Sequence, residues 1–170
     1  MARAAIFVLL SISFVTLAAD ESSYRLGSGD LISITVFDEP ELSMEVRVGD
    51  RPISYPFLGQ VELRDRPIAR IEEEITEGLR GDYLIEPRVS ISVKEYRPFF
   101  ISGEVEKPGG YAYQPGLTLR QAISLGGGLT ERASRNKMFV TRDGRGEEIR
   151  LEMGDPVFPD DVINIEQSFF

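Results

Sequence analysis

The sequence predicts an α+β fold made of two small units, and three observations support this prediction. Short alternations of apolar and polar residues, such as Ile32-Ser33-Ile34, recur along the chain with the period of half-buried strands. The segment 68–79 is apolar at helical spacing. A break at Arg97-Pro98 precedes a second series of strands around another short helix. We expect the units to span residues 20–95 and 96–170.

Composition excludes several classes of function. The chain has 170 residues with 42% hydrophobic residues, which is enough for one domain or two small ones. It has no cysteine and no histidine, so cysteine nucleophiles, serine–histidine systems and nitrogen/sulfur zinc sites are excluded. The net charge of −9 opposes binding to nucleic acid. We therefore expect no cofactor, no metal site and no nucleic-acid partner.

The first nineteen residues are predicted to be a cleavable signal peptide (residues 1–19). Arg3 precedes an apolar run from Ala4 to Val15, and small residues lead to Asp20. Cleavage after Ala18 or after Ala19 fits equally well. About 20 apolar residues are needed to span a bilayer, so an uncleaved anchor is the less favoured alternative. The prediction is a soluble, exported protein.

Strands and one helix are expected in the first unit. Turn residues at 27–30 precede a strand that alternates over 32–37, and further strands are expected at 44–48, at 53–61 with a proline bend, and at 88–93. The helix is expected to begin near Asp65 as N-cap, with Pro67 in the first turn, and to end at Gly81. Its apolar face should pack on the sheet while its glutamates are solvated; that face comprises Ile68, Ile71, Ile75 and Leu79.

The second unit is expected to repeat this mixture of elements. Strands are predicted at 99–105, 111–113 and 162–165, and a hairpin at 138–151 turns at 143–146. Thr118 should cap a short helix that ends at the glycines 126–128. There is also a faint internal echo, because residues 28–34 and 159–165 both place a turn with a carboxylate before an alternating strand.

Six segments, in order, resemble those of the polysaccharide biosynthesis/export family. In the first unit they are YRLGSGD at 24–30, the stretch 53–61 ending in LGQV, and YLIEPRV at 83–89. In the second unit GEV at 103–105 with the following Pro-Gly, the stretch 118–130 ending in GGGLT, and PDDVI at 159–163 resemble a soluble-ligand-binding β-grasp (SLBB) domain. The matching turn residues, expected to be structural, are Gly29, Asp30, Pro56, Gly59, Gly103, Pro108, Gly109, Gly127 and Asp161.

The resemblance implies a non-enzymatic part of a bacterial capsule or exopolysaccharide export machinery, assembled in the periplasm as part of the polysaccharide conduit. It implies a homo-oligomeric ring, an inner-membrane polysaccharide co-polymerase and an outer-membrane β-barrel, porin-like partner. Larger relatives carry a lipidated N-terminal cysteine, a further ligand-binding domain and a C-terminal helix. The chain lacks cysteine, so we expect a minimal member, not lipidated through cysteine, that does not line an outer-membrane pore by itself. Association with the outer membrane is left open.

Two other functions compete with this one. A periplasmic glycan-binding module that forms no conduit is the main alternative. Candidate glycan or partner contacts are Arg97, Phe99, Tyr111 and Tyr113, because aromatic faces and guanidinium groups suit sugar rings and acidic glycans. Alternate members of this aromatic cluster filling the core, or the seam between the units, are the other interpretation.

A carboxylate glycosidase is the third hypothesis. Such an enzyme needs two acids flanking a cleft at roughly 5–10 Å. We expect Asp30 and Asp160 instead to accept backbone N–H groups in turns. The glycines 126–128 follow a helix, so they suit a helix end and not a phosphate cradle. Residues 143–147 suit a hairpin turn because the ligand spacing of a calcium loop is missing.

Overall fold

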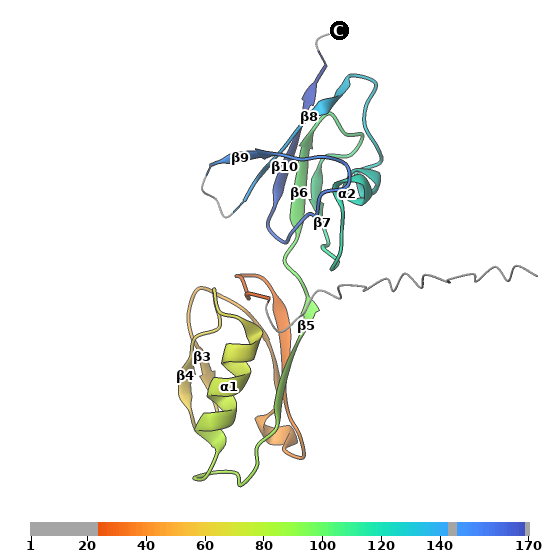
Figure 1. The fold of residues 1–170 in the computed structure, drawn as a ribbon. Helices are drawn as coiled ribbons and strands as arrows, with labels where there is room; N and C mark the ends of the chain where they lie inside the picture. The colour runs from red at the N-terminus through yellow and green to blue at the C-terminus, as the bar shows by residue number, and fades with distance from the viewer. Residues whose placement is uncertain (1–23, 143–145, 169–170) are drawn as a thin grey trace, which may run out of the picture.

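The computed structural model describes residues 24–142 and 146–168, and these form two units in succession (Figure 1). The first unit contains β1 (Leu31–Val36), the 3-10 helix η2 (Pro40–Leu42), β2 (Met44–Arg47), β3 (Ile53–Tyr55), β4 (Gly59–Val61), α1 (Ile68–Leu79) and β5 (Val89–Glu95). The second contains β6 (Phe99–Gly103), β7 (Gly109–Tyr111), α2 (Leu119–Leu125), β8 (Ala133–Thr141), β9 (Glu148–Arg150) and β10 (Val162–Gln167). The predicted α+β class is confirmed. The predicted signal peptide and most of the predicted turn at 143–146 lie outside the described residues.

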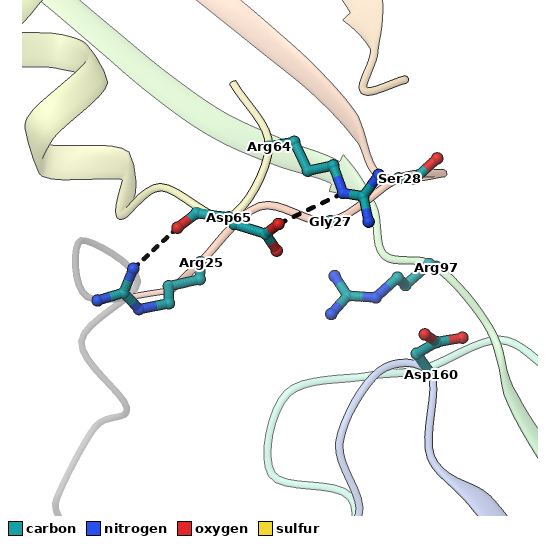
Figure 2. Close-up of a pocket in the computed structure, with 7 residues that line it drawn as sticks. All are labelled: Arg25, Gly27, Ser28, Arg64, Asp65, Arg97 and Asp160. Atoms are coloured by element: carbon teal, nitrogen blue, oxygen red, sulfur yellow. Dashed lines mark hydrogen bonds and ion pairs between the residues drawn. The ribbon is translucent and has the colours of Figure 1, made fainter. Parts of the chain in front are cut away.

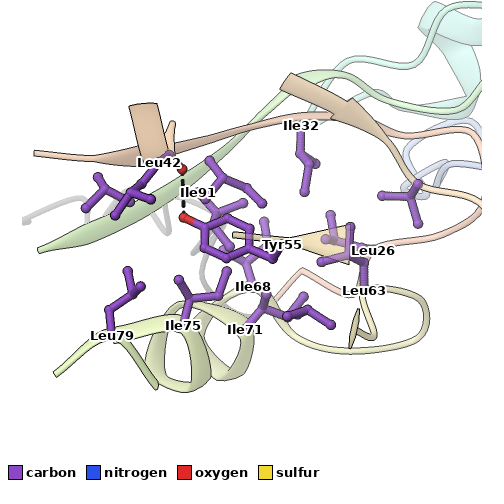
Figure 3. Packing of buried hydrophobic residues seen from close by; sticks show 14 residues of the cluster. Leu26, Ile32, Leu42, Tyr55, Leu63, Ile68, Ile71, Ile75, Leu79 and Ile91 are labelled. Atoms are coloured by element: carbon purple, nitrogen blue, oxygen red, sulfur yellow. Dashed lines mark hydrogen bonds between the residues drawn. The ribbon is translucent and has the colours of Figure 1, made fainter. Parts of the chain in front are cut away.

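An antiparallel sheet with the order β2-β1-β5 forms one layer of the first unit. In the central strand β1, Ile32, Ile34 and Val36 are buried and alternate with more accessible residues. Ile34 lies opposite Ile91 of β5, so neighbouring strands present apolar side chains to the same face. Figure 3 shows these side chains meeting those of α1 and of the β3–β4 hairpin. Within this core the Tyr55 hydroxyl donates to the Leu42 carbonyl oxygen at 2.7 Å.

Helix α1 buries the four predicted aliphatic residues, but its start differs from the prediction. Pro67, with φ −63° and ψ 140°, is the N-cap residue, and Asp65 does not cap the helix. Gly81 has φ +87°, a conformation that glycine adopts at the ends of helices. Not all the glutamates are solvated as expected: Glu72 Oε1 accepts the Ile91 N–H at 2.7 Å. This bond occupies a donor on the edge strand β5.

The predicted bend at Pro56 is a tight turn between β3 and β4. The Leu58 N–H donates to the Pro56 carbonyl oxygen at 2.8 Å, which makes a three-residue γ-turn. Its central residue, Phe57, has φ +65°, an unfavourable conformation for a residue with a side chain. The Phe57 ring is 62% exposed and stacks on Tyr83 with the ring centroids 4.5 Å apart.

A five-stranded sheet with the order β7-β6-β10-β8-β9 forms the second unit. The last strand, β10, lies in the centre, parallel to β6 and antiparallel to β8. Ile163 of β10 therefore lies between Ile101 and Val140, and all three are buried. This arrangement places the chain segment around residue 160 next to the connection between the units.

Helix α2 covers one face of this sheet, as Figure 1 shows. Thr118 is its N-cap as predicted, and the Thr118 N–H donates to Gln121 Oε1 at 2.9 Å. The short strand expected at 111–113 is instead β7, two residues earlier. Neither helix of the described residues is long and apolar enough to cross a membrane.

Candidate functional site at the junction of the two units

A buried carboxylate, Asp30, marks the point where the first unit meets the second. Asp30 directly precedes β1 and has no solvent exposure. Its Oδ2 accepts the Gly27 N–H at 2.8 Å and the Tyr24 hydroxyl at 3.0 Å. Its Oδ1 accepts the Arg97 backbone N–H at 2.8 Å. The predicted turn role of Asp30 is therefore present, and the same carboxylate also reaches a residue 67 positions away.

The Arg97 side chain balances the Asp30 charge. Its Nη1 lies 3.0 Å from Asp30 Oδ2 and donates to the Tyr24 hydroxyl oxygen at 2.9 Å. The Arg97 side chain is 20% exposed, so this ion pair is largely shielded from water. A buried charge requires such a partner, because an unpaired carboxylate in a protein interior is strongly destabilising.

Tyr24 completes this group of three side chains. Its hydroxyl donates a hydrogen bond to Asp30 and accepts one from Arg97, so the group acts both as donor and as acceptor. Burial raises the pKa of Tyr24 well above its ordinary value, and the negative charge of Asp30 raises it further. The phenol consequently stays protonated and acts as a neutral hydrogen-bond bridge between the two charged groups.

A second copy of the Asp30 turn begins β10. The Phe158 N–H donates to Asp161 Oδ2 at 2.9 Å, as Gly27 does to Asp30. In each turn the backbone N–H of the aspartate donates to the carbonyl oxygen three residues earlier, at 3.2 Å. The residue before the aspartate has positive φ in both, +106° at Gly29 and +70° at Asp160. The internal echo in the sequence is thus a repeated turn with the same geometry.

This repeat corrects the role predicted for Asp160. The carboxylate that accepts the turn N–H belongs to Asp161, while Asp160 supplies the left-handed backbone position. Asp161 is also buried and faces an arginine: Arg142 Nε lies 3.0 Å from its Oδ1. The Arg142 guanidinium lies over the Phe158 ring, 4.6 Å from the ring centroid. Each unit thus contains one buried aspartate, and each of these aspartates is paired with an arginine.

Both turns bind the connector between β5 and β6, which comprises residues 96–98. The first turn accepts the Arg97 N–H through Asp30. The second turn donates its Asp160 N–H to the Pro98 carbonyl oxygen at 3.0 Å, and the Phe100 N–H just beyond the connector donates to the Asp161 carbonyl oxygen at 2.8 Å. Backbone groups of the connector are therefore fixed to each unit, and this restricts rotation of one unit against the other.

The aromatic cluster predicted from the sequence is divided between the core and the junction. Tyr96 touches Tyr24 and Tyr113 edge to face, with centroid distances of 5.1 and 5.4 Å. Tyr113 therefore lies in the seam between the units. Phe99 is wholly buried in the core of the second unit, while Tyr111 is partly buried against that core. The Phe99 ring consequently has no face accessible to a ligand.

A polar cleft of about 500 Å³ opens at the junction (Figure 2). Arg97 reaches it from the connector, and Asp160 approaches from the second unit. In the same cleft Arg64 Nε lies 3.4 Å from Asp65 Oδ2, and Arg25 Nη1 donates to the Asp65 carbonyl oxygen at 2.8 Å. The remaining lining residues are Gly27 and Ser28. The cleft therefore offers guanidinium donors and carboxylate acceptors side by side.

Other motif residues lie away from this cleft and shape the backbone. Gly103 has φ +83° at the end of β6, and a Cβ there would lie 2.1 Å from the Ile165 carbonyl oxygen. Gly127 has φ +83° just after α2. Gly59 and Pro56 lie at the β3–β4 turn, whereas Pro108 and Gly109 lie where β7 begins.

Sequence reasoning missed Arg25, Arg64 and Arg142 as members of the two charged clusters. Arg142 could have been found from the echo, because a second buried aspartate requires a second cation. No signal in the sequence places Arg64 near Arg97, since only the packing of the β4–α1 loop brings them together.

Comparison with known proteins agrees with this arrangement of two units. Residues 18–94 match the family described as polysaccharide biosynthesis/export protein, and residues 98–157 match the SLBB domain. The exopolysaccharide production protein ExoF of Rhizobium meliloti strain 1021 is 36% identical over 154 residues, which cover 81% of this chain and 35% of ExoF.

Two further relatives are named EPS I polysaccharide export outer membrane protein EpsA. The protein from Ralstonia nicotianae is 26% identical and that from Ralstonia solanacearum 27% identical, each over 76% of this chain and 41% of its own length. The chain thus spans between a third and about two fifths of the length of these relatives.

These findings define a protein with an export domain followed by an SLBB domain. Its first unit matches the polysaccharide biosynthesis/export family, and the chain is homologous to the ExoF and EpsA proteins.

Proposed function

We propose that this chain is a non-enzymatic component of a capsule or exopolysaccharide export machinery, and that it assembles in the periplasm as part of the polysaccharide conduit. The observation that supports this proposal is that the connector, residues 96–98, is hydrogen-bonded to a turn in each unit. A subunit that packs into a larger wall needs its parts held in a fixed orientation. The two buried carboxylates of the described residues, Asp30 and Asp161, are each paired with an arginine, which suits a structural role.

The domain boundary in this proposal falls between Glu95 and Tyr96, with an export domain at 20–95 and an SLBB domain at 96–170. The partners are further copies of the chain in a ring, an inner-membrane polysaccharide co-polymerase and an outer-membrane partner. These partners follow from family membership, and the relatives named as outer membrane export proteins support an envelope location.

A surface for self-association is proposed on the sheet face that α2 leaves uncovered. Phe100 of β6 and Val162 of β10 are adjacent in register and are 42% and 43% exposed. Exposed apolar side chains that adjoin on an uncovered sheet face can form the centre of a protein–protein contact. Neighbouring copies that bury this pair would gain the transfer free energy of both side chains.

Native mass spectrometry of the processed chain tests the proposal. The wild-type protein should form a closed oligomer, and Phe100→Ser should shift it toward the monomer. Ile149→Thr is the matched control, because Ile149 is also 43% exposed but lies opposite Val140, whose side chain points to the other face. A wild-type protein that stays monomeric at all accessible concentrations, alone and with the co-polymerase, would contradict the proposal.

A further inference from the structure

The junction cleft contains one cation and one anion that the protein leaves without an ionic partner. Arg25 forms no ion pair with any described residue, and within the described part of the chain its side chain makes one hydrogen bond, to the Asp65 carbonyl oxygen. Asp160, on the second unit, likewise has no hydrogen bond or ion pair from its side chain among the described residues. Both groups line the same cleft of about 500 Å³.

The other two arginines of the cleft are already balanced. Arg64 is paired with Asp50 at 2.7 Å as well as with Asp65. Arg97 is paired with the buried Asp30 through Nη1, which leaves its Nε and Nη2 donors without a partner in the described chain. Hydrogen bonds to Asp30 and Tyr24 hold the Arg97 guanidinium in one orientation. Its remaining donors are therefore fixed in position.

Gly27 leaves the space in this cleft that the Arg97 guanidinium occupies. A Cβ at this position would lie 2.2 Å from Arg97 Nη1, so only glycine allows the guanidinium to lie against the backbone. Figure 2 shows Arg97 near Asp160, with Arg25 on the opposite side of the group of lining residues. Donors, one unbalanced cation and one unbalanced carboxylate thus surround a single space.

We propose that this cleft binds one sugar unit that carries a carboxylate. The sugar carboxylate pairs with Arg25, its hydroxyls donate to Asp160, and its ring or hydroxyl oxygens accept from Arg97. The inference rests on the proposed function, because the sugar would belong to the polysaccharide being exported. Arg25 is the one guanidinium lining this cleft that has no ion pair with a described residue, so it can attract the acidic group of such a sugar.

A neutral sugar would use only part of this arrangement. Without a carboxylate it leaves Arg25 unbalanced, and it loses the ionic contribution to affinity. A chloride ion would also use only part of the arrangement, because it can pair with Arg25 but has no hydroxyl group to donate to Asp160. An acidic sugar is favoured because its carboxylate can pair with Arg25 while its hydroxyl groups donate to Asp160.

Isothermal titration calorimetry on the full processed chain at low ionic strength tests the inference. The probes are trigalacturonate and its neutral counterpart galactotriose. The acidic trimer should bind at least about tenfold more tightly, a difference of about 1.4 kcal/mol. Added salt should reduce this preference, since the ionic contact is near the surface. Equal affinity for the two trimers, or no saturable binding of either, would overturn the inference.

Three variants locate the contacts. Arg25→Gln should abolish the preference for the acidic trimer, while Asp160→Asn, which tolerates the φ of +70°, should weaken both trimers. Arg70→Gln is the control, because Arg70 is exposed on α1 and pairs with Glu73. A preference that survives Arg25→Gln would place the acid elsewhere and overturn the assignment. Native mass spectrometry of the same samples separates the two proposals: an oligomer that binds no sugar contradicts only the cleft, and a monomer contradicts the proposed function.

Discussion

The Arg97 guanidinium occupies the space in which a side chain on Gly27 would begin. A Cβ at Gly27 would lie 2.2 Å from Arg97 Nη1 and 2.4 Å from Arg97 Cζ, distances at which one of the groups must move. Gly27 belongs to the first unit and Arg97 to the connector. The absence of a side chain at one position therefore determines where the charge of the other lies, and with it the partner of Asp30.

Replacing Gly27 by alanine should expel the Arg97 guanidinium and leave Asp30 without its cation. We expect Gly27→Ala to lower the free energy of unfolding by about 2–4 kcal/mol, because a buried charge that loses its partner is strongly destabilising. Urea denaturation measures the change. Gly49→Ala is the control, since nothing lies within 4 Å of a Cβ built there. Equal stability of the two variants would show that Arg97 is not required at this position.

Ionisation of Tyr24 should make the protein less stable in alkali. An unfolded tyrosine ionises near pH 10, whereas the pKa of the folded Tyr24 lies well above that value because of burial and the Asp30 charge. Above pH 10 the unfolded chain has therefore lost a proton that the folded chain keeps, and the free energy of unfolding falls as pH rises.

The expected contribution of Tyr24 is about 1.4 kcal/mol per pH unit above pH 10. Denaturant unfolding at a series of pH values measures this slope, and Tyr24→Phe should make it shallower by that amount. Burial also raises the pKa of Tyr55 and of Tyr113, so some slope should persist in the variant. Identical slopes in the two proteins would contradict the burial of the Tyr24 hydroxyl.

Glu72 should contribute more to stability than its neighbour Glu73. The Glu72 carboxylate accepts the Ile91 N–H at 2.7 Å, whereas Glu73 makes an exposed ion pair with Arg70. Hydrogen bonds to charged groups contribute about 1.5–3 kcal/mol and exposed helix pairs about 0.3–0.5 kcal/mol. Glu72→Ala should therefore destabilise the fold by at least about 1 kcal/mol more than Glu73→Ala in thermal or urea unfolding. The reverse order would exclude this role for Glu72.

Phe57 should be dispensable for stability although it is a large aromatic residue. Its φ of +65° stores strain of about 1–3 kcal/mol, and its stacking on Tyr83 contributes about 0.5–1.5 kcal/mol. Because these effects oppose each other, Phe57→Gly should change stability by less than about 1 kcal/mol. The buried Phe99 is the comparison, and Phe99→Ala should cost about 3–5 kcal/mol. A large loss for Phe57→Gly would show that the turn is not strained.

Much of the fold was predictable because its elements follow local patterns. The buried residues of α1 and β1 follow the helical and strand periods, and the Thr118 cap follows from short-range hydrogen bonding. The start of α1 was predicted wrongly at Asp65, because Asp65 has φ +59° and lies beside Arg64. Local propensity for capping was overridden there by the packing of the loop.

The junction was predictable only in part. The echo and the family motif single out Asp30 and Asp161, since a carboxylate in a turn is a local feature. Their partners Arg97 and Arg142 are 67 and 19 residues away, and no local pattern specifies such pairs. The central position of β10 is likewise a matter of topology, and it is this topology that brings Asp160 to the connector.

Polysaccharide released by living cells gives the most direct test of the central claim that this protein moves sugar polymers without altering them. The gene is deleted, and the polymer in the medium is compared with that retained in the cells, with and without the gene restored. The account predicts that deletion depletes the medium, that polymer of unchanged repeat composition is retained or its synthesis falls, and that restoring the gene reverses both effects. Normal release from the deletion strain would contradict the account.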